Sequence, residues 1–139
     1  MKLVIDTNVF LDVILDRPNR DAAAKVLALS EREDFELLMP AHAAATIAYL
    51  VEKSKDRSTA AQALSLCLGI ANVAPLDESA ILRGLSLGFR DIEDSFVAAI
   101  AIREQADFIV TGSVKDFTGS LVPATTAIEL MAKLDQQGS

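Results

Sequence analysis

The sequence begins Met1-Lys2-Leu3-Val4-Ile5-Asp6-Thr7-Asn8, and this stretch decides the fold that we expect. The three consecutive apolar residues at 3–5 are typical of a strand buried on both faces, because a half-buried strand would alternate apolar and polar residues. The run ends at Asp6, and two small polar residues separate it from a second apolar segment. We therefore place Asp6 at the carboxyl end of a central parallel strand, where open α/β sheets hold their sites.

Asp6 has two interpretations at this position. A buried carboxylate requires hydrogen-bond donors or positive charge, which Thr7, Asn8 and the N-terminus of a following helix would supply. In the simpler interpretation Asp6 is only the N-cap of that helix, because Asp is one of the residue types preferred there. In the other, Asp6 belongs to a functional site at the edge of the sheet.

The composition indicates one globular domain. The chain has 139 residues, of which 51% are hydrophobic, and a formal net charge of −7. That charge does not favour attraction of the whole molecule to nucleic acid, but it fits a site built from carboxylates. The single cysteine, Cys67, excludes an internal disulfide, and its apolar neighbours predict a buried thiol. No signal peptide or membrane span is visible, so we expect a cytoplasmic protein without a membrane partner.

Helical and extended patterns alternate along the rest of the chain. The expected helices span residues 8–15, 21–32, 41–53, 59–68, 78–87, 91–105 and 125–134, with Gly69 and Gly88 ending two of them. The expected strands after the first span residues 35–39, 70–76 and 107–111. This alternation, without a hairpin signal, predicts an α/β domain whose parallel sheet is covered by helices on both faces. We place the domain at residues 1–135 and a frayed tail at 136–139.

Acidic side chains gather at the expected ends of strands and starts of helices. Asp91 and Asp94 open one helix at i, i+3 spacing, so both carboxylates face the same way. Three polar side chains follow the last long strand, namely Thr111, Ser113 and Asp116. Alone, Asp91 and Asp94 are explained equally well as an N-cap and a first-turn acid. Carboxylates that converge at a sheet edge repel one another, however, and a hard divalent cation is the usual resolution.

Three motifs in this order and spacing now identify a resemblance to a known family. They are Val4-Ile5-Asp6-Thr7-Asn8, Asp91-Ile92-Glu93-Asp94-Ser95-Phe96, and the segment ADFIVTGSVKDF at 106–117. Over nearly its whole length the chain resembles the PIN domain, the nuclease fold of VapC-type toxins. The resemblance implies a five-stranded parallel sheet and an endoribonuclease that depends on Mg²⁺ or Mn²⁺, with a metal-activated water attacking an RNA phosphodiester. It also implies a homodimer and a cognate antitoxin as protein partners.

The resemblance assigns roles to individual side chains. The catalytic and metal-binding acids would be Asp6, Asp91, Asp94 and Asp116. Of these, Asp6 and Asp94 match the first and third acids of the family and would bind the metal directly. The supporting residues would be Thr7, Asn8, Thr46, Thr111 and Ser113. The basic residues that would hold the RNA backbone are Arg17, Arg90 and Lys115, each of which is also explained as a solvated surface charge.

Two positions depart from the family pattern. Thr46 stands where the family usually carries a Glu, and Ser113 stands where many relatives carry Asp or Asn. Both residues keep an oxygen that can hold water, but neither contributes charge. Glu52 lies about 240° around the helix from Thr46 and does not compensate. His42 lies on the same face as Thr46 and would approach the site, although a histidine on an alanine-rich helix is also explained as structural.

The missing acid keeps a second class of function open. A PIN-like module with a reduced acid set would bind RNA or a partner protein without cleaving anything. The four remaining acids favour the nuclease. Haloacid-dehalogenase-like phosphatases also place an Asp after their first strand, in the pattern Asp-x-Asp-x-Thr/Val, but Asn8 and Phe10 occupy the later positions here. The general acid of that class is therefore missing.

Overall fold

The central sheet contains five strands in the order β3-β2-β1-β4-β5, and every pairing between them is parallel. The strands are β1 (Lys2–Ile5), β2 (Glu36–Pro40), β3 (Asn72–Ala74), β4 (Phe108–Val110) and β5 (Ala124–Thr125). The computed structural model describes residues 1–137. Both the predicted α/β class and the five parallel strands are confirmed, and β1 is the central strand.

The apolar run of β1 is buried on both faces, as predicted. Leu3, Val4 and Ile5 have no exposed surface. Because successive side chains of a strand point to opposite faces, Leu3 and Ile5 pack into one hydrophobic core and Val4 into another. Two cores, one on each face, therefore leave no polar position between Lys2 and Asp6.

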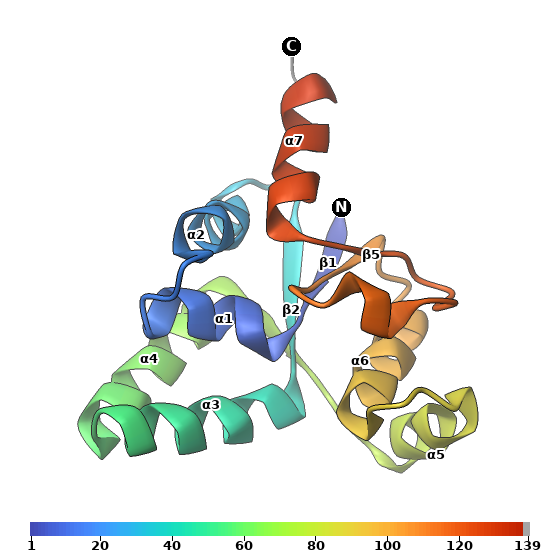
Figure 1. Cartoon of the computed structure of the whole chain (residues 1–139), viewed down its shortest axis with the longest axis horizontal. Helices are drawn as coiled ribbons and strands as arrows, with labels where there is room; N and C mark the ends of the chain where they lie inside the picture. Colours follow the sequence, from blue (N-terminus) through green and yellow to red (C-terminus); the bar gives the residue numbers. More distant parts are fainter. Residues whose placement is uncertain (138–139) are drawn as a thin grey trace.

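Seven α-helices and two 3₁₀ turns surround the sheet within residues 1–137. They are α1 (Thr7–Ile14), α2 (Arg20–Ala28), η1 (Leu29–Glu31), α3 (Ala41–Ser54), α4 (Arg57–Ile70), α5 (Glu78–Leu87), α6 (Ile92–Arg103), η2 (Val114–Phe117) and α7 (Ala127–Gln137). Figure 1 shows α1 to α4 gathered on one side of the strands and α5 and α6 on the other. None of these helices is long and apolar enough to span a lipid bilayer.

Several expected boundaries differ from those in the structure. α4 continues through Gly69 to Ile70, because burial of its Ala63 and Cys67 side outweighs the cost of one helical glycine, about 1 kcal/mol. The expected strand at 70–76 is correspondingly reduced to β3. α2 ends at Ala28, and the residues that were expected to form its last turn form the 3₁₀ turn η1 instead.

The C-terminal boundary also differs from the expectation. α7 begins at Ala127 rather than at residue 125, because Thr125 pairs with β4 as part of β5. Thr126 accepts a hydrogen bond on Oγ1 from the backbone N–H of Glu129 at 3.1 Å, which caps the helix. The helix runs to Gln137 and so includes residues 136–137 of the expected tail. Residues 138–139 of the expected tail lie outside the described residues.

The pairing of α5 with α6 fixes the helix that carries the second acidic motif. A Cβ atom added to Gly84 of α5 would lie 2.8 Å from Cδ1 of Phe96, so the two helices approach as closely as glycine permits. Five consecutive residues of α6, Val97 to Ala101, are buried, since α5 covers the side that the sheet does not. The N-terminus of α6 is thereby held at the carboxyl edge of the sheet.

Candidate metal centre

Asp6 lies at the carboxyl end of β1 and is 7% exposed. Its Oδ1 accepts a hydrogen bond from the backbone N–H of Thr7 at 2.9 Å, which makes Asp6 the N-cap of α1. Its Oδ2 accepts a second bond from Oγ1 of Thr111 at 2.9 Å. Burial raises the pKa of Asp6, while the hydrogen bonds from Thr111 and Thr7 act in the opposite direction. Asp6 is therefore the N-cap of α1, and its second oxygen is bound by the residue that follows β4.

Thr111 is placed for this role by the loop that follows β4. Its backbone N–H donates to the carbonyl of Thr125 in β5 at 2.9 Å. Its hydroxyl also accepts a hydrogen bond from the backbone N–H of Ser113 at 3.1 Å. The hydroxyl thus joins the start of the last motif to the carboxylate of Asp6.

The second motif forms the N-terminus of α6, as predicted. Asp91 is the N-cap, and its Oδ1 accepts a hydrogen bond from the backbone N–H of Asp94 at 3.2 Å. Ser95 donates from its backbone N–H to the carbonyl of Asp91 at 3.1 Å. Asp91 is exposed and Asp94 is half-buried. The i, i+3 spacing therefore brings both carboxylates to one end of one helix.

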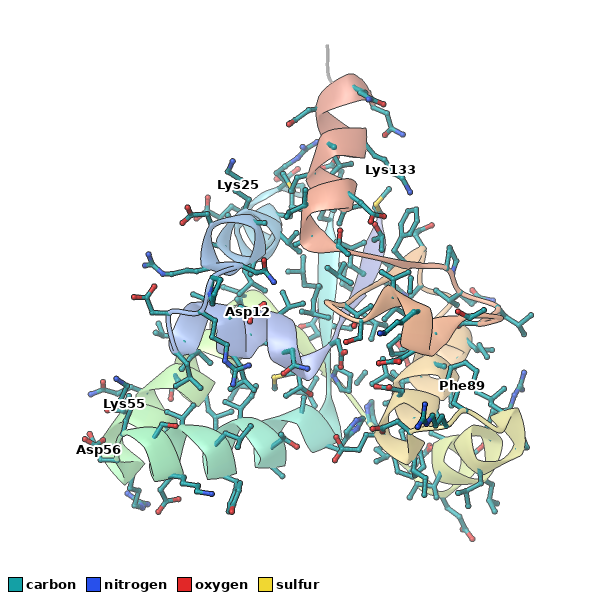
Figure 2. The ribbon with its side chains drawn as sticks, viewed as in Figure 1. Asp12, Lys25, Lys55, Asp56, Phe89 and Lys133 are labelled. Atoms are coloured by element: carbon teal, nitrogen blue, oxygen red, sulfur yellow. The ribbon has the colours of Figure 1, made fainter. Side chains whose placement is uncertain are left out.

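An aromatic contact joins the loop before α6 to the turn that carries Asp116. The rings of Phe89 and Phe117 meet edge to face, with centroids 6.1 Å apart. Figure 2 labels Phe89 beside the segment that leads into α6. Asp116 precedes Phe117 in η2, and Asp91 lies two residues beyond Phe89. The contact therefore brings two predicted acids from distant parts of the sequence to the same edge.

The predicted acids converge on one pocket of about 220 Å³. Eight of its lining residues were predicted as site residues, namely Asp6, Thr7, Asn8, Thr46, Asp91, Asp94, Ser113 and Asp116. The other lining residues are Leu11, His42, Leu50, Glu93 and Val97. The lining comes from α1, α3, α6 and the loop after β4, so the fold assembles this pocket from segments that are far apart in the sequence.

The pKa of Asp94 is raised in this pocket. Burial is the largest cause that raises its pKa, to about 7, and the carboxylates of Asp6, Asp91, Asp116 and Glu93 raise it further, in that order. Burial and the negative charge of the neighbouring acids therefore both disfavour the ionised form of Asp94. A divalent cation would relieve this repulsion, because it would replace the proton with a double positive charge.

The donor set fits a hard divalent cation. The pocket offers carboxylate and hydroxyl oxygens, which are the atoms that Mg²⁺ and Mn²⁺ bind. Within residues 1–137, however, no three His, Cys, Asp or Glu side chains are close enough to form a metal site as they stand. The expectation that the acids already lie within bridging distance of one ion is therefore not met. Mutual repulsion favours such separation when no cation is bound.

The three predicted basic residues lie at different distances from the pocket. Arg17 donates from Nη1 to Oδ1 of Asn8, a lining residue, at 3.4 Å. Arg90 lines a neighbouring pocket of about 340 Å³ together with Asp91 and Asp116. Lys115 is exposed in η2 and lines neither pocket. The fold thus brings Arg17 and Arg90 to the site, whereas Lys115 is only adjacent in sequence to a lining residue, Asp116.

The α3 side of the pocket contains the departure from the family pattern. Thr46 lines the pocket, and its hydroxyl donates to the carbonyl of His42 at 3.5 Å. His42 lines the pocket too, and burial lowers its pKa, whereas Glu93 and Asp6 act in the opposite direction. Nδ1 of His42 is buried without a hydrogen-bond partner within residues 1–137. Glu52 is exposed and does not line the pocket, as predicted.

Sequence reasoning missed Glu93 as a residue of the site. The motif that contains it was recognised, but no role was assigned to Glu93, because adjacent residues of a helix are about 100° apart and spacing alone does not place Glu93 beside Asp94. At the first turn of α6 the helix end itself borders the pocket, and Glu93 lines it as well. A signal was present in the three acids within four residues at 91–94.

The chain also matches a known protein family. A family model described as the PIN domain matches residues 2–115. No curated protein matches the sequence significantly.

Solved structures share the whole fold at low sequence identity. A chain of VapBC2 from Rickettsia felis, solved with a DNA fragment from its promoter, is 20% identical, with a TM-score of 0.74 over 91% of this chain and 98% of that chain. A chain of DNA-bound VapBC from Salmonella typhimurium is 14% identical, with a TM-score of 0.72 over 91% and 98% of the two chains. VapC20 from Mycobacterium tuberculosis, a toxin that cleaves the sarcin-ricin loop, is 11% identical, with a TM-score of 0.64 over 77% and 86%. The family model covers most of the sequence, so the chain belongs to the PIN domain family.

Proposed function

We propose that this chain is a divalent-metal-dependent endoribonuclease of the VapC toxin type. The observation that carries the proposal is the convergence of Asp6, Asp91, Asp94 and Asp116 on one pocket at the carboxyl edge of the sheet. In parallel α/β sheets this edge is where ligands bind. Family membership and the cleavage named for VapC20 support RNA as the substrate class.

Each acid would bind the metal in a way that depends on its position in the pocket. Asp6 is held by two hydrogen bonds, so it would provide a fixed ligand for Mg²⁺ or Mn²⁺. Asp94 faces the same pocket and would provide the second ligand, while Asp91 and Asp116 would bind directly or through water. A cation held there would supply Lewis acidity, which would make water nucleophilic near neutral pH and neutralise charge on the phosphate.

Polar and basic residues around the acids would orient the RNA. Arg17 lies at Asn8 and Arg90 lies beside Asp91, so each is next to a lining residue of the acidic pocket, where guanidinium groups would bind phosphates of one strand. Lys115 would add a weaker phosphate contact from η2. Because the net charge of the chain is −7, such local contacts would have to outweigh long-range repulsion of RNA.

Two protein partners belong to the proposal. Solved VapBC complexes of the same fold support a cognate antitoxin. A homodimer is supported by apolar side chains left in water on the hairpin of α5 and α6. Leu82, Leu85 and Ile92 are 61%, 56% and 58% exposed, and such clusters commonly mark protein interfaces.

Cleavage of a mixed single-stranded RNA pool in Mn²⁺ tests the proposal. We expect weak cleavage by the wild type, because Thr46 adds no charge to the metal site, and none by Asp6→Asn. Asp21→Asn removes an exposed carboxylate of α2 outside the pocket and should cleave as the wild type does. If the wild type and Asp6→Asn are equally inert but bind RNA or a partner protein, the chain is the non-catalytic module instead.

A further inference from the structure

The pocket has no acid on its α3 side. The residues that α3 contributes to the lining are His42, Thr46 and Leu50, and none of them has a carboxylate group. The α6 side contributes three acids, Asp91, Glu93 and Asp94. Thr46 therefore leaves the α3 side of the pocket without a carboxylate ligand.

The contact between α3 and α6 places Glu93 across the pocket from Thr46. The ring of His42 meets the ring of Phe96 edge to face, with centroids 6.0 Å apart. Glu93 lies three residues before Phe96, and Thr46 lies four residues after His42, so each shares a helix face with one of the two rings. The face of α6 that carries Glu93 is therefore turned toward the face of α3 that carries Thr46.

Electrostatics support the same placement. Burial lowers the pKa of His42, and Glu93 opposes that lowering more strongly than Asp6 does; the charge of Glu93 also acts to raise the pKa of Asp6 and of Asp94. Its carboxylate forms no hydrogen bond or ion pair within residues 1–137, unlike the capping carboxylate of Asp91. Glu93 is exposed, so its side chain is free to change rotamer and extend into the pocket.

We propose that Glu93 supplies the carboxylate that this chain lacks at Thr46, so that α6 rather than α3 completes the ligand set of the cation. The inference rests on the proposed function only in requiring that the pocket bind a divalent cation. A glutamate has one methylene more than an aspartate, and that extra length would let Glu93 reach toward α3 from the first turn of α6.

Mn²⁺ affinity measured by isothermal titration calorimetry tests this role without requiring activity. We expect Glu93→Gln to weaken binding on the order of 10-fold, a typical effect of losing a residue that supports a metal site. The matched control is Glu78→Gln. Glu78 also follows an Asp N-cap in the first turn of a helix, α5, but it lies outside the pocket. The control should bind Mn²⁺ as the wild type does.

A shorter acid separates ligation from charge. Glu93→Asp keeps the negative charge but shortens the side chain, and we expect it to lose most of the affinity that Glu93→Gln loses. Wild-type affinity in Glu93→Asp would show that Glu93 acts only through its charge, which would overturn the inference.

Restoring the usual acid on α3 provides the reciprocal test. Thr46→Glu should tighten Mn²⁺ binding more in the Glu93→Gln background than in the wild type, because the two carboxylates would serve the same position. Equal gains in both backgrounds would contradict the inference.

The outcomes for the inference and for the proposed function are distinct. If Asp6→Asn abolishes Mn²⁺ binding while Glu93→Gln and Glu78→Gln are both equal to the wild type, the metal centre stands and the role of Glu93 is wrong. If the wild type itself binds no Mn²⁺ at millimolar concentration, the inference and the proposed function are both wrong.

Discussion

Thr111 Oγ1 donates a hydrogen bond to Oδ2 of Asp6 at 2.9 Å, linking the ends of two neighbouring strands, β4 and β1. Both residues are buried, so the bond satisfies a carboxylate that water does not reach freely. The same hydroxyl fixes the loop that leads to Ser113. This one bond therefore couples the stability of the sheet edge to the geometry of the proposed metal ligand.

Removing the Thr111 hydroxyl should destabilise the protein. We expect Thr111→Val to lower the free energy of unfolding at pH 7 by about 1.5–3 kcal/mol, as for other hydrogen bonds to charged groups. The control is Thr125→Val, because Thr125 is equally buried and donates only to a backbone carbonyl, at 3.2 Å. Its loss should be about 0.5–1.5 kcal/mol. Equal losses in urea denaturation would show that Asp6 gains nothing from Thr111.

Asp94 should make the metal-free protein less stable as pH rises. Its pKa is raised to about 7, so the folded protein binds this proton at pH values where the unfolded chain has released it. The resulting penalty is absent below about pH 4 and complete above about pH 7. In EDTA at pH 8, Asp94→Asn should therefore raise the Tm by about 2–5 °C, a modest value because solvent screens a half-exposed group.

The same variant should lose its advantage in acid. At pH 4.5 the wild-type Asp94 is already protonated in the folded state, so the two proteins should melt at similar temperatures. A Tm difference that is the same at pH 4.5 and pH 8 would show that the repulsion assigned to Asp94 is not the cause.

Alanine substitutions at two helical glycines should change the stability of the protein in opposite directions. Gly84→Ala would place a Cβ against Phe96 and the backbone of Ser95, so we expect it to destabilise the protein by about 1–3 kcal/mol. Gly69 has no atom within 4 Å of its Cβ position, so Gly69→Ala should stabilise α4 by about 0.5–1 kcal/mol. Denaturant unfolding of both variants checks the prediction, which fails if Gly84→Ala is neutral.

The exposed apolar side chains of α5 should determine the oligomeric state. Light scattering after size exclusion should show a dimer for the wild type and a monomer for the double variant Leu82→Glu and Leu85→Glu. Leu66→Glu is the control, because Leu66 is 73% exposed but lies on α4. A dimer that survives the α5 changes would place the interface elsewhere.

The parts of the fold that the sequence predicted well are those with local signals. α5 was expected at residues 78–87 and is found there, because Asp77 accepts from the backbone N–H of Ala80 and Gly88 adopts the left-handed conformation at φ 71°. β1 was predicted from its apolar run, whose side chains pack into both hydrophobic cores. In contrast, β5 has only two residues, and its pairing with β4 rather than any residue preference defines it.

The site was predictable to the extent that it depends on strand ends. Asp6, Asp91, Asp94 and Asp116 were singled out by their places after strands or at the start of a helix, the family resemblance gave them their metal-binding roles, and all four line the pocket. Glu93 and the edge-to-face contact of His42 with Phe96 were not assigned, because they depend on how α3 packs against α6. Spacing within one helix does not contain that information.

Manganese-soaked crystals provide the most direct test of the central claim, that the carboxylate pocket is a metal centre. Anomalous scattering at the manganese edge should show a peak within about 2.0–2.5 Å of carboxylate oxygens from both Asp6 and Asp94. Crystals of Asp94→Asn soaked in the same way should show a weaker peak or none. A wild-type structure at saturating Mn²⁺ with manganese only at other sites would contradict the account.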